Sequence, residues 1–133
     1  MDSDPMRSSV ALNVLGRPLA PCNMKPLTGY FRDGCCHTDP GDRGLHVICA
    51  EMTKDFLEFS ATRGNDLRSA QSRFNFPGLK PGDRWCLCAA RWLEARAAGL
   101  APPVLLASTH LNALGVVTLQ QLLEHALDRP STV

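Results

Sequence analysis

The chain has 133 residues and a mass of 14.5 kDa, which is enough for one domain with one core but not for a second catalytic module. Lys and Arg number 14 against 13 Asp and Glu, so the formal net charge is +1 and the strongly positive field typical of nucleic-acid-binding proteins is missing. Apolar residues make up 44% and charged residues 20%, as in an ordinary folded domain. A nucleic-acid partner is therefore not expected.

The sequence lacks the patterns of exported and membrane-spanning proteins. Residues 1–16 carry acidic residues before the first arginine and only a short apolar run, unlike a signal peptide. The apolar stretch 101–107 contains prolines and falls short of the roughly 18 residues of a membrane span. We therefore expect a cytoplasmic protein with no membrane partner, divided into a flexible segment (1–12), one domain (13–128) and a frayed tail (129–133).

The first half of the sequence predicts one strand and one helix. Residues 13–44 are rich in proline and glycine, so we expect turns and short extended pieces there. The apolar run 45–52 predicts a buried strand, and Thr53 is a suitable N-cap for a helix over residues 54–62. Residues 65–83 show little periodicity and predict a long loop, which in a compact domain is often functional.

Residues 84–88 predict the central strand of the sheet. Trp85 and Leu87 alternate with Cys86 and Cys88, and both sets are apolar, as expected when both faces of a strand are covered. Trp85 is expected to be buried against a helix.

The second half of the sequence continues with helices and one further strand. Residues 89–98 predict a helix and residues 103–107 a strand, which with the preceding strand form a right-handed β-α-β unit. A short turn or helix is expected at 110–114, and Thr118 with Gln121 predicts a capping box for a C-terminal helix over about 119–128. The expected fold is α+β, with helices packed on a mixed sheet.

The six cysteines are the least ordinary feature of the composition; they are Cys22, Cys35, Cys36, Cys49, Cys86 and Cys88. In a reducing compartment we expect unpaired thiols or metal ligands, and a core that holds the fold without cross-links. No Cys-x-x-Cys pair is present, so no metal cofactor is predicted outright. Zinc is the alternative, with ligands drawn from Cys35, Cys36, His46, Cys49, Cys86 and Cys88.

The polar stretch 32–37 suggests thiol chemistry. Arg32 and His37 flank two adjacent cysteines, and a cation with an imidazole stabilises a thiolate. Cys35 or Cys36 is therefore the candidate nucleophile of a thiol-dependent enzyme, with His37 beside it. Asp33 opposes the charge of Arg32.

A second group of polar residues lies in the glycine-bounded loops and at the entry to the predicted central strand. Such residues can frame a small ligand, and the alternative is that they cap a helix and form structural ion pairs. The candidates are Arg32, Asp33, Asn65, Asp66, Arg68, Asp83 and Arg84. The leading interpretation is a module that binds a small molecule or a protein partner; enzyme activity is left open.

Four stretches of the sequence together resemble a known family: residues 28–36, 42–50, 64–67 and 76–92. Read together, they are similar to the family catalogued as domain of unknown function 2237, and the resemblance extends over about residues 13–128. It implies a two-layer α+β sandwich and assigns no activity. No catalytic residue can be carried over from it.

Overall fold

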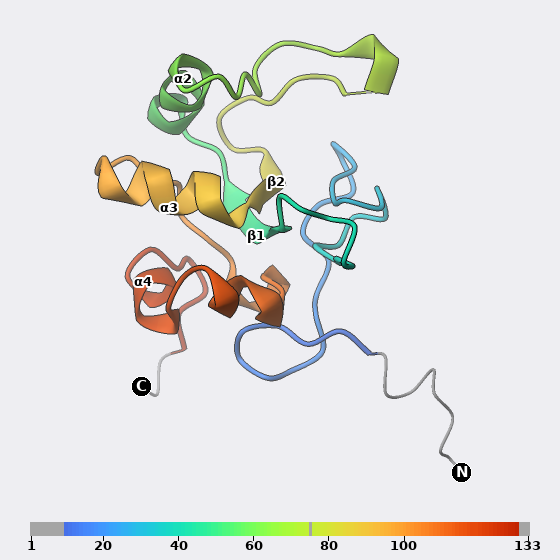
Figure 1. The fold of residues 1–133 in the computed structure, drawn as a ribbon, viewed down its shortest axis with the longest axis vertical. Coiled ribbons are helices and arrows are strands. Elements are labelled where there is room, and N and C mark those ends of the chain that lie inside the picture. The colour runs from blue at the N-terminus through green and yellow to red at the C-terminus, as the bar shows by residue number, and fades with distance from the viewer. Residues whose placement is uncertain (1–9, 75, 131–133) are drawn as a thin grey trace.

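The computed structural model describes residues 10–74 and 76–130. Its regular elements are β1 (His46–Glu51), α2 (Lys54–Thr62), β2 (Arg84–Cys88), α3 (Ala89–Ala97) and α4 (Leu119–Leu123), with three short 3₁₀ helices at Ser72–Phe74, Leu106–Ser108 and Leu111–Gly115 (Figure 1). The α+β class is confirmed. Within the described ranges, no helix is long and apolar enough to cross a membrane. Most of the two predicted flexible ends, residues 1–9 and 131–133, lies outside those ranges.

The sheet is smaller than predicted, and β1 rather than β2 lies in its middle. β1 and β2 pair antiparallel, and on its other side β1 meets a single bridge from Val104 to Ala50. The predicted strand 103–107 is wrong beyond this bridge. The amides of Leu106 and Ala107 donate to the carboxylate of Asp128, and the chain turns into a 3₁₀ helix there. The mixed sheet, the two-layer sandwich and the β-α-β unit stay predictions.

The predicted helices in the middle of the chain are confirmed almost residue for residue. The Thr53 hydroxyl accepts a hydrogen bond from the Phe56 amide at 3.0 Å and begins α2, while α3 follows directly on β2. The capping box of Thr118 and Gln121 is present, but α4 ends at Leu123. It is shorter than predicted because residues 124–127 turn back to bond Val104.

The two faces of the sheet pack against different material. On one face Ile48, Ala50, Trp85 and Leu87 join the main core with α2 and α3. On the other face, Cys49 and Cys86 form a second buried cluster with Cys22 and Cys36. The latter two belong to the N-terminal segment, residues 10–44, whose backbone passes beside the sheet (Figure 1). The alternation predicted for β2 is therefore correct, and Trp85 is buried as expected, although its aromatic partner is Phe76 of the loop.

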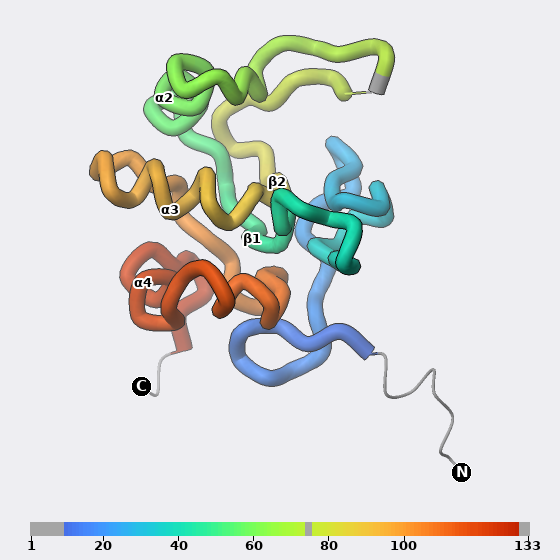
Figure 2. The backbone as a smooth tube through the Cα atoms, in the orientation of Figure 1, coloured from blue at the N-terminus to red at the C-terminus, as the bar shows by residue number. Residues whose placement is uncertain are grey.

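The described N-terminal segment carries no long helix, as predicted (Figure 2). Two disulfides tie it to the sheet. Cys22 is bonded to Cys49 of β1, and Cys36 is bonded to Cys86 of β2. The expectation of unpaired cysteines and a fold without cross-links is therefore wrong for this structure. The pairing follows from the path of the segment, which brings the Cys22 amide to the Gly34 carbonyl at 2.7 Å and so places both cysteines over the same part of the sheet.

Candidate functional site

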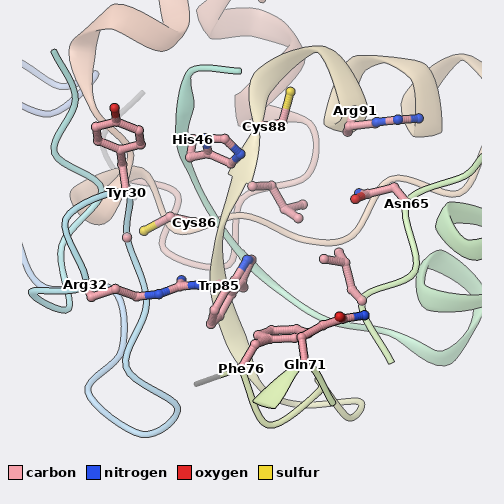
Figure 3. Close-up of a pocket in the computed structure, with 13 residues that line it drawn as sticks. Tyr30, Arg32, His46, Asn65, Gln71, Phe76, Trp85, Cys86, Cys88 and Arg91 are labelled. Atoms are coloured by element: carbon pink, nitrogen blue, oxygen red, sulfur yellow. The ribbon is translucent and has the colours of Figure 1, made fainter. Parts of the chain in front are cut away.

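A pocket of about 450 Å³ runs along the outer edge of β2 (Figure 3). Its floor contains residues 85–88, one wall comes from the N-terminal segment, and the other comes from the long loop and α3. The lining residues are Gly29, Tyr30, Arg32, His46, Asn65, Leu67, Gln71, Phe76, Trp85, Cys86, Leu87, Cys88 and Arg91. Apolar walls with a few polar groups that converge on the space are typical of a small-molecule site.

A buried carboxylate holds His46 in the pocket wall. His46 Nδ1 donates to Asp42 Oδ1 at 2.7 Å, and the His46 amide and the Thr38 hydroxyl each donate to Asp42 Oδ2 at 3.0 Å. Burial disfavours the charged form of Asp42, but these hydrogen bonds outweigh it and lower the pKa of the carboxyl. Because an ionised carboxylate only accepts, the neutral imidazole carries its proton on Nδ1 and presents a free lone pair on Nε2.

Two local features of the backbone determine the direction of the His46 side chain. The ladder is irregular between His46 and Ile48, so that His46 lies opposite Cys88 while Ile48 lies opposite Leu87. A bulge of this kind turns one side chain to the other face of the sheet, and bulges are frequent next to active sites. Gly44 leaves room for the ring, since a Cβ at this position would lie 2.7 Å from His46 Cε1.

Cys88 is the thiol of the pocket. It is one of two unpaired cysteines within the described residues, it is half-buried, and it is the N-cap residue of α3. Side chains directly opposite each other in an antiparallel pair have Cβ atoms about 4.5–5.5 Å apart. His46 and Cys88 therefore stand next to each other at the end of the pocket nearest to α3 (Figure 3).

Basic side chains lie at both ends of the pocket. The Arg32 guanidinium lies 5.0 Å from the centroid of the Trp85 ring, and no carboxylate partner is found for it in the described part of the chain. Arg32 has a left-handed backbone, with φ of 56°, as does Leu45; this conformation is costly for a residue with a side chain, and such residues cluster at functional sites. At the other end, Arg91 donates to the Arg63 carbonyl at 3.0 Å and lies 3.4 Å from Glu94.

The predicted ligand residues are only partly brought together. Arg32 and Asn65 line the pocket, whereas the other five do not. Asp66 accepts from the Arg68 amide and the Ser69 hydroxyl, which lower its pKa, and Arg68 lies 4.0 Å from Asp66. Asp83 accepts from the Lys80 amide, and Arg84 pairs with Glu51. A binding role for these residues stays a prediction.

The predicted nucleophile region forms a separate, more exposed cluster. Asp33 Oδ2 accepts from His37 Nδ1 at 2.8 Å and its Oδ1 accepts from the Cys35 amide at 3.0 Å. Burial by itself would raise the pKa of Asp33, but these hydrogen bonds outweigh burial, so the pKa is lowered. Burial, with the nearby charge of Asp33, raises the pKa of the Cys35 thiol and disfavours its thiolate.

The disulfides correct two further expectations about the cysteines. Cys36 is fully buried and bonded to Cys86, so it is no free nucleophile in this structure. Cys36, Cys49 and Cys86 were also expected as zinc ligands, but their sulfurs are engaged in disulfides. The sulfurs of Cys22, Cys36 and Cys49 lie within 4.8 Å of one another, and so do ligand atoms of Asp33, Cys35 and His37. Zinc binding stays a prediction.

Sequence reasoning missed Asp42, Arg91 and the pairing of His46 with Cys88. One signal was present, because Asp-x-x-x-His occurs twice, at 33–37 and 42–46. The sequence does not show which of the two pairs is buried beside a pocket.

The comparisons with known proteins agree with the resemblance noted in the sequence. A family model described as "Uncharacterized protein conserved in bacteria (DUF2237)" matches residues 12–126, which is most of the chain. The chain belongs to this family. A search of curated proteins found no match.

Proposed function

We propose that this member of the DUF2237 family binds a small anionic molecule with an apolar body in the pocket beside β2. The observation that carries the proposal is the composition of the pocket wall. Arg32, Arg91 and His46 line it, and no acidic residue is found among its lining residues in the described part of the chain. We thereby assign the binding role expected from the sequence to this pocket and to this class of ligand.

The charge of the walls favours an anion. Arg32 lacks a carboxylate partner within the described ranges, so its guanidinium is available to a carboxylate or phosphate, which it can bind through two parallel hydrogen bonds. Asn65 and Gln71 add amide groups that hydrogen-bond to polar parts of a ligand.

The apolar part of the wall favours a flat or aromatic body. Trp85 and Phe76 are in edge-to-face contact with ring centroids 5.1 Å apart, and Leu67 and Leu87 continue the same surface. A volume of about 450 Å³ lies in the range of about 300–1,000 Å³ seen for small-molecule sites.

Calorimetric titration with 2-naphthoate tests the proposal, because this probe combines a flat apolar body with one carboxylate. We expect saturable binding of 2-naphthoate and at least about tenfold weaker binding of 2-naphthamide, which has the same shape without the charge. Equal affinity for the acid and the amide would contradict an anion site.

Arginine variants locate the binding. Arg32→Gln should weaken 2-naphthoate binding about tenfold, the equivalent of one charge-assisted hydrogen bond. Arg17→Gln is the matched control, since Arg17 is exposed and does not line the pocket. Loss of binding in both variants would indicate a diffuse charge effect rather than this site. Native mass spectrometry of freshly purified protein would then report any molecule that is retained from the cell.

A cytoplasmic location stays a prediction, and the disulfides make it testable. Disulfides persist mainly in oxidising compartments. Trapping the thiols of intact cells with acid and then labelling them with a mass-tagged maleimide counts the free cysteines. A protein in a reducing cytoplasm should label at all six cysteines, whereas a doubly bridged protein labels at Cys35 and Cys88 alone.

A further inference from the structure

The described residues contain two similar groups of an aspartate, a histidine and an unpaired cysteine. One group is Asp33, His37 and Cys35, and the other is Asp42, His46 and Cys88. Each histidine donates from Nδ1 to its aspartate, at 2.8 and 2.7 Å respectively. The two groups differ in their surroundings, and this difference decides which of them can support chemistry.

Burial separates the two aspartates. The Asp33 side chain is 42% exposed, whereas that of Asp42 is 1% exposed and accepts three hydrogen bonds. A buried, fully hydrogen-bonded carboxylate fixes the ring and the tautomer of its histidine, as in catalytic triads. Water screens the attraction between an exposed aspartate and an exposed histidine, so such a pair holds its ring less firmly.

The position of the thiol also separates the two groups. Cys88 and His46 both line the pocket, while Cys35 and His37 do not. Cys88 stands at the start of α3, where the first amides of a helix lack partners within the helix; that of Ala89 donates to the Leu45 carbonyl at 3.0 Å, so the amides that follow it are the ones that can donate to an oxyanion. The thiol of Cys88, among the described residues, makes no capping hydrogen bond.

We infer that Cys88 is a nucleophile, His46 its general base and Asp42 the positioning residue, and that they act on an activated acyl group, an ester or thioester, of an anionic ligand in the pocket. This inference rests on the proposed function for its ligand class. Among the described residues no hydrogen bond joins Cys88 to His46, and the Cys88 sulfur points away from the ring (Figure 3), so the inference requires the Cys88 side chain to rotate toward His46 Nε2; catalytic hydrogen bonds are often open in unliganded sites.

The reaction divides into two balanced steps. In the first, His46 Nε2 takes the proton of the Cys88 thiol, the sulfur bonds to the acyl carbon, and the bond from that carbon to the leaving group breaks. The leaving group departs with the proton from His46. In the second, water gives a proton to His46 and bonds to the acyl carbon, the carbon–sulfur bond breaks, and the sulfur takes the proton back. The products are a carboxylic acid and an alcohol or thiol.

The mono-4-nitrophenyl ester of terephthalic acid tests the inference, because it carries an activated acyl group and one carboxylate that cannot reach its own ester carbon. We expect a burst of one nitrophenolate per protein and an acyl group on Cys88, located by peptide mass spectrometry. 4-Nitrophenyl benzoate, which has the same body without the carboxylate, should react at least about tenfold more slowly. Equal rates for the two esters would overturn the anionic substrate class, and acylation of Cys35 instead would overturn the nucleophile.

Histidine variants of the two groups are matched. His46→Gln should slow the burst about a hundredfold or more, the low end of the contribution of a general base, whereas His37→Gln should leave it unchanged. Gly44→Ala crowds the His46 ring without removing it, so the rate of its burst should lie between the rates of the two histidine variants. A burst unaffected by His46→Gln overturns the role of His46. Folding of each variant is checked by circular dichroism.

Neutral iodoacetamide separates this inference from the proposed function, since its reaction needs no anion site. Cys88 should be alkylated about tenfold or more faster than Cys35, and His46→Gln should remove the difference. If 2-naphthoate binds but Cys88 is alkylated no faster than Cys35, the nucleophile is wrong while the binding proposal stands. If Cys88 is reactive and 2-naphthoate does not bind, the binding proposal fails and the substrate class falls with it.

Discussion

In residues 46–100 most of the described chain lies in strands and helices, whereas residues 10–44 form turns whose backbone bonds are mostly local and reach the rest of the chain at a few points. The Val14 amide reaches the Thr109 carbonyl, and the Ala20 amide reaches the Ala107 carbonyl. Two disulfides complete these links. The pocket lies between the two regions, and Arg32 from one meets Trp85 from the other. One wall of the candidate site is therefore held by cross-links and the other by packing.

The largest effect should come from emptying the packed region. Trp92 of α3 is fully buried, and its Nε1 donates to the Pro102 carbonyl at 3.0 Å. Trp92→Ala should lower the free energy of unfolding by about 3–5 kcal/mol, measured by urea denaturation, because it leaves a large cavity. Trp92→Phe should cost clearly less. A loss below about 1 kcal/mol for the alanine variant would contradict the packing described for α3.

The cross-linked region should respond next to loss of a disulfide. Replacing both Cys22 and Cys49 by serine should cost about 2–4 kcal/mol. Hydrogen exchange should then rise in residues 10–44 while the amides of α2 and α3 stay protected. Cys35→Ser, which touches no disulfide, is the control. Uniform loss of protection would show that the two regions are not held separately.

The comparison of the two regions also explains what the sequence could predict. The elements β1, β2, α2 and α3 depend on local signals, such as the Thr53 cap and the alternation around Trp85, and these were predicted correctly. The partners of Cys22 and Cys36 depend on the path of an irregular segment, which no periodicity records. The strand predicted at 103–107 failed because a distant carboxylate, that of Asp128, bonds the amides a strand would have used.

The candidate site was predictable to a similar extent. Arg32 and Asn65 were selected because polar residues beside glycine in loops often bind ligands, and both line the pocket. His46 was considered only as a metal ligand, because its opposite partner, Cys88, becomes apparent only once the register and the bulge of β1 are known. Cys36 was selected as a nucleophile from its neighbours in sequence, but its burial and its bond to Cys86 are properties of the fold.

Asp42, which joins the irregular segment to β1, should have an intermediate effect that depends on pH. Its pKa is lower in the folded protein than in the unfolded chain, so its contribution is present above about pH 4 and is lost as the pH falls through the folded-state value. Asp42→Asn should cost about 1.5–3 kcal/mol at pH 7 and flatten the loss of stability in acid. Urea denaturation at several pH values measures both effects.

Asp33→Asn is the matched control for Asp42→Asn. Its pair with His37 is exposed, so the same change should cost only about 0.2–1 kcal/mol at pH 7. Equal losses in the two variants would mean that burial does not distinguish the two pairs, and the argument for His46 over His37 would lose its basis.

Smaller effects than that of Asp42→Asn should also come from two threonine hydroxyls that accept backbone amides in the two regions. Thr53 caps α2 at a half-buried position, while Thr28 is fully buried and accepts from the Cys86 amide at 2.9 Å. Thr53→Val should cost about 1 kcal/mol, as for other lost N-caps. Thr28→Val keeps the shape but leaves a buried amide without its acceptor, so it should cost between about 1 and 2 kcal/mol, within the range for an unsatisfied donor.

Thr28 also holds the edge of β2 that forms the pocket floor, so Thr28→Val should weaken 2-naphthoate binding while Thr53→Val leaves it unchanged. If the two variants affect binding equally, the N-terminal segment does not shape the pocket and the wall it supplies is incidental.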